Sequence, residues 1–96
     1  MQLSEIKIDL VSSLCRQYGV KSLRVFGSVA RGDSHAGSDL DLLVTFSKPI
    51  SLLQLVHLER QFSDALGRKV DLVTEKSVSP YLRTRIVKES VPVYAA

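Results

Sequence analysis

The fold is decided by one segment, Phe26-Gly27-Ser28-Val29-Ala30-Arg31-Gly32-Asp33-Ser34-His35-Ala36-Gly37-Ser38-Asp39-Leu40-Asp41-Leu42-Leu43-Val44. The segment has two parts joined by a short polar loop. The first part is a Gly-Ser turn that follows an apolar stretch, and the second is a pair of carboxylates at the start of another apolar stretch. Each part predicts a chemical role.

The carboxylate pair stands on a segment of period two, in which Leu40, Leu42 and Val44 alternate with Asp39 and Asp41. This alternation predicts a strand with one apolar face. The two carboxylates then project from the opposite face, roughly 6.5–7 Å apart along the strand. They repel each other unless a cation neutralises them, and Mg²⁺ prefers such oxygen ligands. The alternative interpretation is a solvated strand face that carries two exposed acids.

The Gly-Ser turn comes where a strand over residues 21–26 ends. Gly27 lets an anion approach the backbone closely, and Ser28 can donate its hydroxyl to a phosphate or cap the following turn. A short helix or turn is expected over residues 28–34. A plain turn is the alternative for this motif alone. Next to an acidic pair, the turn predicts the phosphate half of a metal–triphosphate site. Arg31 would either reach phosphate or pair with an acid.

The two half-motifs, Gly27 to Gly32 and Ser38 to Leu42, together resemble the signature of the nucleotidyltransferase superfamily that includes DNA polymerase β. The short chain is most similar to the minimal nucleotidyltransferases, the MntA-type antitoxin partners of HEPN-domain toxins. The resemblance implies an α/β nucleotidyltransferase fold, with helices packed on a small mixed sheet and an open acidic face.

This resemblance also implies roles for particular residues. Asp71, in a later apolar stretch, occupies the place of the third carboxylate, shared between metal binding and proton acceptance. The expected ligands of two Mg²⁺ ions are Asp39, Asp41 and Asp71. The residues expected to bind ATP are Gly27, Ser28, Arg31 and Ser38.

The implied activity is transfer of AMP from MgATP to a tyrosine of a HEPN ribonuclease toxin, as the antitoxin of a type VII-like pair. A hetero-oligomer with the toxin is then expected. Two alternatives remain open. The chain could block the toxin stoichiometrically without turnover, or it could modify a small molecule, as aminoglycoside nucleotidyltransferases do. The latter enzymes usually carry an additional domain.

The composition sets wider bounds on the function. A chain of 96 residues is expected to form one domain, residues 1–96. A net charge of +3 is too small for a dense basic patch, so sequence-specific nucleic-acid binding is not expected. No apolar run reaches membrane-spanning length. The single cysteine, Cys15, is expected to be a buried thiol in a cytoplasmic protein.

Caps and periodicity predict the remaining elements. A first helix is expected from a Ser4 cap to Gly19, and a second from a Ser51 cap to Gly67. A strand around residues 70–73 carries Asp71, and residues 91–94 form an edge strand that tolerates its proline.

A last helix is expected to begin at Ser79-Pro80. It should pack Leu82, Ile86 and Tyr81 inward and turn its basic residues outward. Those basic residues would be either solvated or in contact with nucleotide or a partner; they are Arg83, Arg85 and Lys88.

Overall fold

The computed structural model describes residues 7–32 and 39–96. Within these residues, four strands form a mixed sheet in the order β3-β2-β1-β4, in which β2 and β3 are parallel and the other pairs are antiparallel. The elements are α1 (Ile8–Tyr18), β1 (Val20–Phe26), α2 (Gly27–Arg31), β2 (Leu40–Phe46), α3 (Leu52–Leu66), β3 (Val70–Thr74), the 3-10 turn η2 (Glu75–Ser77), α4 (Pro80–Glu89) and β4 (Val91–Ala95). The predicted small mixed sheet with packed helices is therefore confirmed.

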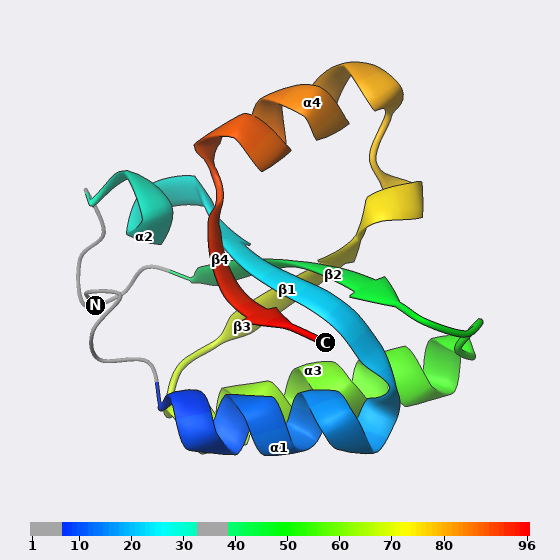
Figure 1. The fold of residues 1–96 in the computed structure, drawn as a ribbon. Coiled ribbons are helices and arrows are strands. Elements are labelled where there is room, and N and C mark those ends of the chain that lie inside the picture. Colours follow the sequence, from blue (N-terminus) through cyan, green and yellow to red (C-terminus); the bar gives the residue numbers. More distant parts are fainter. Residues whose placement is uncertain (1–6, 33–38) are drawn as a thin grey trace.

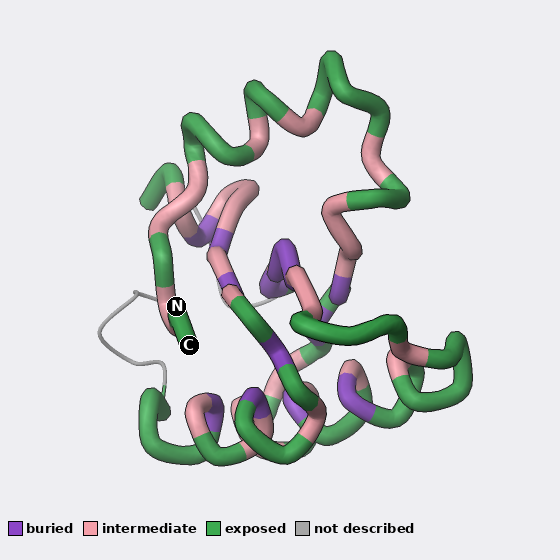
Figure 2. Tube along the Cα trace, turned by 45° about the vertical axis from the view of Figure 1, so that its right-hand side comes forward, coloured by how far each residue is buried: buried purple, intermediate pink, exposed green. Residues whose placement is uncertain are grey.

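The two long helices, α1 and α3, lie side by side on one face of the sheet, while α2 and α4 lie on the other side (Figure 1). Buried residues follow the strands and the sheet-facing sides of α1 and α3 (Figure 2). The core consists of Val11, Cys15, Val20, Leu23, Val25, Val29, Leu40, Leu42, Val44, Leu58, Phe62, Val70 and Leu72. The second face of the sheet carries polar side chains beside the buried Leu43.

The predicted helix ends are borne out where the structure describes them. Gly19 and Gly67 adopt the left-handed conformation that ends a helix, and Ser51 forms a reciprocal capping box with Gln54. Ser79 caps α4 with Pro80 directly after it. Ser4 lies outside the described residues, and the described helix starts at Ile8 after Lys7.

The expected packing of α4 is confirmed only in part. Ile86 is half-buried and Arg85 and Lys88 are exposed, as predicted, but the other residues differ. None of its residues is buried, Tyr81 is 93% exposed and Leu82 is 52% exposed. Arg83, expected to point outward, is instead half-buried and donates to the backbone carbonyls of Glu75 and Val78. The polar contacts of Arg83 therefore add to the partial burial of Ile86 in holding α4. Apolar spacing misplaced Tyr81 and Leu82, because α4 contributes no residue to the core.

Cys15 is fully buried, as expected, and its thiol is free. Burial raises the pKa of this thiol to about 12, against a small opposing effect from Arg16. Because the thiolate is the reactive form, Cys15 is a packing residue. No helix of the described residues is long and apolar enough to cross a membrane.

The outer edge of β3 is closed by side chains of α3. The Val70 amide donates to Ser63 Oγ at 3.1 Å, and the Leu72 amide donates to Glu59 Oε2 at 2.9 Å. Helix α3 thus supplies the acceptors that a fifth strand would otherwise provide. These hydrogen bonds hold β3 in place against α3, and with it the backbone of Asp71.

We predict that Glu59→Ala lowers the free energy of unfolding by about 1–3 kcal/mol, because the Leu72 amide is left without an acceptor. Glu59→Gln keeps an acceptor oxygen and should lose much less. Asp64→Ala, on the exposed side of the same helix, is the control and should change stability by less than about 0.5 kcal/mol. Urea unfolding followed by circular dichroism measures all three, and equal losses in the two Glu59 variants would contradict the assignment.

Candidate active site

Three carboxylates gather where β2 and β3 begin. Asp41 lies opposite Asp71 in the parallel β2–β3 register, and Asp39 directly precedes β2. The neighbouring Leu40, Leu42 and Leu72 are buried in the core, so Asp41 and Asp71 project from the other face of the sheet. The strand periodicity therefore places both on the open side.

The pKa of Asp41 is raised by its surroundings, which include the other two acids. Partial burial is the main cause that raises the pKa of Asp41, and the negative charges of Asp71 and Asp39 raise it further. The positive charge of Arg31 opposes them. A half-buried carboxylate next to two others is unfavourable unless a cation is supplied.

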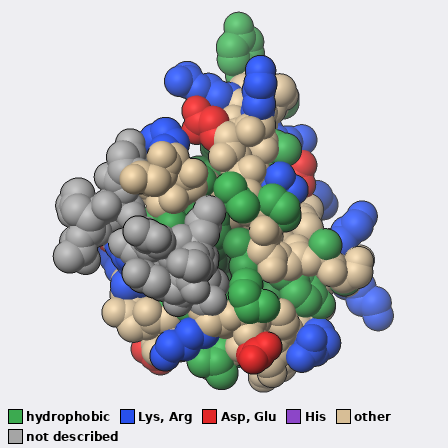
Figure 3. All heavy atoms as spheres, turned by 60° about the vertical axis from the view of Figure 1, so that its left-hand side comes forward, with side chains coloured by type: hydrophobic (Ala, Val, Ile, Leu, Met, Phe, Trp, Pro, Cys, Tyr) green, Lys and Arg blue, Asp and Glu red, His purple; other side chains and the backbone are tan. Residues whose placement is uncertain are grey.

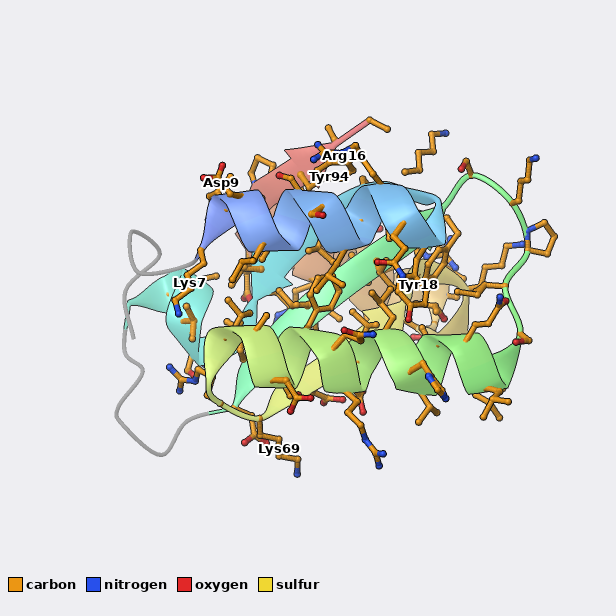
Figure 4. All side chains as sticks on the ribbon, turned by 90° about the horizontal axis from the view of Figure 1, so that it is seen from below. Lys7, Asp9, Arg16, Tyr18, Lys69 and Tyr94 are labelled. Carbon is orange, nitrogen blue, oxygen red and sulfur yellow. The ribbon has the colours of Figure 1, made fainter. Side chains whose placement is uncertain are left out.

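Asp39 is more exposed than Asp41. Its carboxylate lies 3.8 Å from the ammonium group of Lys69, and both side chains are largely exposed. Figure 4 shows Lys69 beyond the end of α3, pointing outward. An exposed pair of this kind contributes little to stability and can open easily.

Asp41 also contacts the Gly-Ser turn. A Cβ placed on Gly27 would overlap Asp41 Oδ2 and lie 3.1 Å from Asp41 Cγ. Gly27 has φ +75°, a backbone conformation that residues with a side chain rarely adopt. The register pairs Phe26 with Asp41, so the end of β1 is held directly beside the start of β2. The two halves of the sequence motif are therefore adjacent in space.

The remaining predicted site residues have mixed outcomes. Ser28 is half-buried and is the second residue of α2, so it does not cap that helix, which begins at Gly27. Arg31 ends α2 and lies 3.9 Å from Glu89, the last residue of α4. Ser38 lies outside the described residues. Sequence reasoning missed Lys69 and Glu89, because neither carries a local signal for its distant partner.

The carboxylate oxygens of this site suit a magnesium ion whose other ligands come from the substrate and from water. Among residues 7–32 and 39–96, no group of three His, Cys, Asp or Glu side chains could hold an ion by itself. Mg²⁺ is commonly bound through one or two carboxylates, with substrate phosphates and water filling the other positions. The half-buried Asp41, repelled by two like charges, is suited to such a shared ion.

Comparison with known proteins gives consistent matches. Residues 7–93 match the family described as "Nucleotidyltransferase domain". The chain is 35% identical over 96 residues to protein adenylyltransferase MntA of Thermococcus cleftensis, covering 97% of each chain. A solved structure described as a minimal nucleotidyltransferase is 40% identical with a TM-score of 0.85, covering 96% of each chain.

A more distant likeness concerns the fold alone. A chain in the solved complex of tri-AMPylated Shewanella oneidensis HEPN toxin with MNT antitoxin has a TM-score of 0.73 at 20% identity. The match covers 98% of this chain and 74% of that one.

We predict that Gly27→Ala damages the site more than Gly32→Ala does. Both glycines have φ near +75°, at 75° and 77°, so both variants carry about the same backbone strain of roughly 1–2 kcal/mol. Only at Gly27 does the new methyl group meet Asp41, since no described residue lies within 4 Å of a Cβ at Gly32. Calorimetric titration with MgATP should show weakened binding for Gly27→Ala alone. Equal losses in both variants would contradict the contact.

We also predict that Asp41→Asn stabilises the metal-free protein. Because the pKa of Asp41 is raised in the folded state, the ionised group lowers folding stability at neutral pH, and this loss disappears as protonation proceeds. In EDTA at about pH 7, the variant should melt at a higher temperature than the wild type, with the difference shrinking toward about pH 4. Asp64→Asn, an exposed acid on α3, is the control. A lower melting temperature for Asp41→Asn would refute the repulsion.

Proposed function

Since this chain belongs to the nucleotidyltransferase domain family, we propose that it transfers AMP from MgATP to a hydroxyl group of a partner protein. The observation that carries the proposal is the group of three carboxylates around Asp41, in contact with the Gly27 turn. A phosphate-binding turn and an acidic metal site are both needed for this reaction, and here the turn that ends β1 lies beside the start of β2.

The turn after β1 is proposed to bind the triphosphate of the nucleotide. Gly27 has no side chain, so the β- and γ-phosphates can come close to its backbone, and Ser28 can donate its hydroxyl to them. Arg31 supplies a positive charge at the end of the same short helix. Ser38 is proposed to support the carboxylate strand from the other half of the motif.

Asp39 and Asp41 are the proposed ligands of Mg²⁺, and Asp71 is proposed to share a second ion. The bound metal would neutralise the carboxylates and clamp the triphosphate. Asp71 is exposed on the same face and is free to accept the proton of the incoming hydroxyl. The acceptor oxygen forms a bond to the α-phosphorus, and the bond to pyrophosphate breaks.

The proposed acceptor is a tyrosine of a HEPN-domain toxin, which the transfer silences. This follows the relative named protein adenylyltransferase MntA and the fold shared with the MNT–HEPN complex. The natural setting would be the cytoplasm, in a hetero-oligomer with the toxin. Direct sequence-specific binding of nucleic acid is not part of the proposal.

The decisive experiment incubates the protein with MgATP and a HEPN-domain protein as the candidate partner, followed by intact mass measurement. The expected result is a gain of one or more AMP units on the partner. Omitting Mg²⁺ should abolish the gain. Complex formation without any mass gain would favour stoichiometric blocking, and AMP transfer to a small molecule alone would favour the aminoglycoside-type alternative.

We predict that Asp71→Asn separates transfer from binding. The variant should fold and still bind MgATP, because Gly27, Ser28, Asp39 and Asp41 remain. Transfer should fall by at least on the order of 10²-fold, the low end for loss of a general base. Asp64→Asn should transfer normally. If Asp71→Asn fails to transfer AMP but still fully protects cells that express the toxin, neutralisation is by binding.

A further inference from the structure

Tyr81 is the tyrosine of this chain whose side chain stands clear of the fold. The three tyrosines of the chain all lie within the described residues. Tyr18 and Tyr94 are half-buried and pack against the hydrophobic core, whereas Tyr81 on α4 is 93% exposed. The Tyr81 hydroxyl makes no hydrogen bond to any described residue. The side chain therefore contributes little to the fold, and its hydroxyl group is accessible to another molecule.

The backbone that carries Tyr81 is firmly held. Ser79 caps the start of α4. Arg83 donates hydrogen bonds to the backbone carbonyls of Glu75 and Val78, and so ties the first turns of the helix to the segment before it. Tyr81 is thus presented on a fixed support, which lowers the entropy that is lost when its phenol ring enters another site.

The exposed face of α4 around Tyr81 is basic. Arg85 lies one helical turn after Tyr81 and Lys88 lies one turn further, so the three residues share one stripe of the helix. The Arg85 side chain is 77% exposed, and its Nε lies 3.8 Å from Oε1 of Glu89, the only acid of α4. Basic residues therefore outnumber acidic ones on this helix. At the upper end of the molecule, where α4 lies, basic side chains stand beside a protruding hydrophobic one (Figure 3).

Tyr81 lies away from the carboxylates of its own molecule. Helix α4 meets α2 at its other end, where Glu89 Oε2 lies 3.9 Å from Arg31 Nη1. Tyr81 lies eight residues before Glu89, about 12 Å back along the helix. In Figure 1, α4 accordingly begins on the side of the molecule away from α2. The site that this phenol can enter is therefore that of another molecule.

We propose that Tyr81 accepts AMP from a second copy of this chain, an inference that rests on the proposed transferase function. The Tyr81 oxygen forms a bond to the α-phosphorus of ATP in the second copy, the phenol proton passes to Asp71 of that copy, and the bond to pyrophosphate breaks. Charge favours the encounter. The three carboxylates Asp39, Asp41 and Asp71, together with a bound triphosphate, present a negative surface to the basic stripe on α4.

The test incubates the purified protein with MgATP and no partner, followed by intact mass measurement and peptide mapping. The expected result is a gain of one AMP unit, located on Tyr81. Tyr81→Phe should show no gain, and it should still transfer AMP to the HEPN-domain protein. Tyr94→Phe is the matched control and should gain AMP like the wild type, because its ring packs against the core.

A mixture of two variants tests whether the transfer is intermolecular. Isotope-labelled Asp71→Asn transfers poorly but keeps Tyr81, whereas Tyr81→Phe transfers but has no acceptor. The labelled Asp71→Asn chain should gain AMP and the Tyr81→Phe chain should not. Replacing Arg85 and Lys88 by Gln should slow self-transfer by about two- to ten-fold at low ionic strength, and by much less at about 1 M salt, where the charges are screened.

Three results would overturn the inference. They are the absence of AMP on a wild type that transfers AMP to the HEPN-domain protein, an equal gain in Tyr81→Phe, and no gain by Asp71→Asn in the mixture. The last result would place the transfer within one molecule. The first leaves the proposed function standing, so the two hypotheses can fail separately. A wild type that transfers AMP neither to itself nor to the HEPN-domain protein would refute both.

Discussion

The structure depends on the contact between the Asp41 carboxylate and the bare Cα of Gly27. This contact exists because the β1–β2 register sets Phe26 against Asp41, and because Gly27 has a positive φ that turns the chain into α2 at that point. One residue of a different kind at position 27 would separate the turn from the acids. The chemistry of the site is thus set by a steric condition before any charge is considered.

Repulsion among the three carboxylates opposes folding. Burial of the apolar face of the same strands offsets this cost. Leu40 and Leu42 are buried on either side of Asp41, and Val70 and Leu72 are buried on either side of Asp71. Burying such side chains contributes about 1.5–3 kcal/mol each relative to leaving them exposed. The alternation within each strand therefore both builds the core and presents the acids on the opposite face. The buried residues hold in place acids that would otherwise move apart.

The sequence could predict what depends on neighbours along the chain. Period-two alternation located the strand of Asp41, and the Ser51 and Gly67 caps located α3, because these signals act over a few residues. The partners in long-range pairs were not predicted, although pairing of Arg31 with some acid was one of two alternatives. Arg31 with Glu89, and Asp39 with Lys69, are joined only through the sheet order. The prediction that Tyr81 and Leu82 pack inward was wrong for a related reason, since apolar spacing shows that a helix has two faces but not whether a core lies beneath it.

The closed edge of β3 bears on how this chain behaves in the presence of other chains. An exposed strand edge is a template for strand addition, which leads to domain swapping and aggregation. On one side of this sheet, Ser63 and Glu59 already occupy the outward amides of Val70 and Leu72. On the other side, β4 is only five residues long and contains Pro92, which has no amide to offer. An incoming strand would have to break two hydrogen bonds at one edge or accept a gap at the other. The sheet is thereby protected against growth by strand exchange, and its helical and loop surfaces remain for recognition.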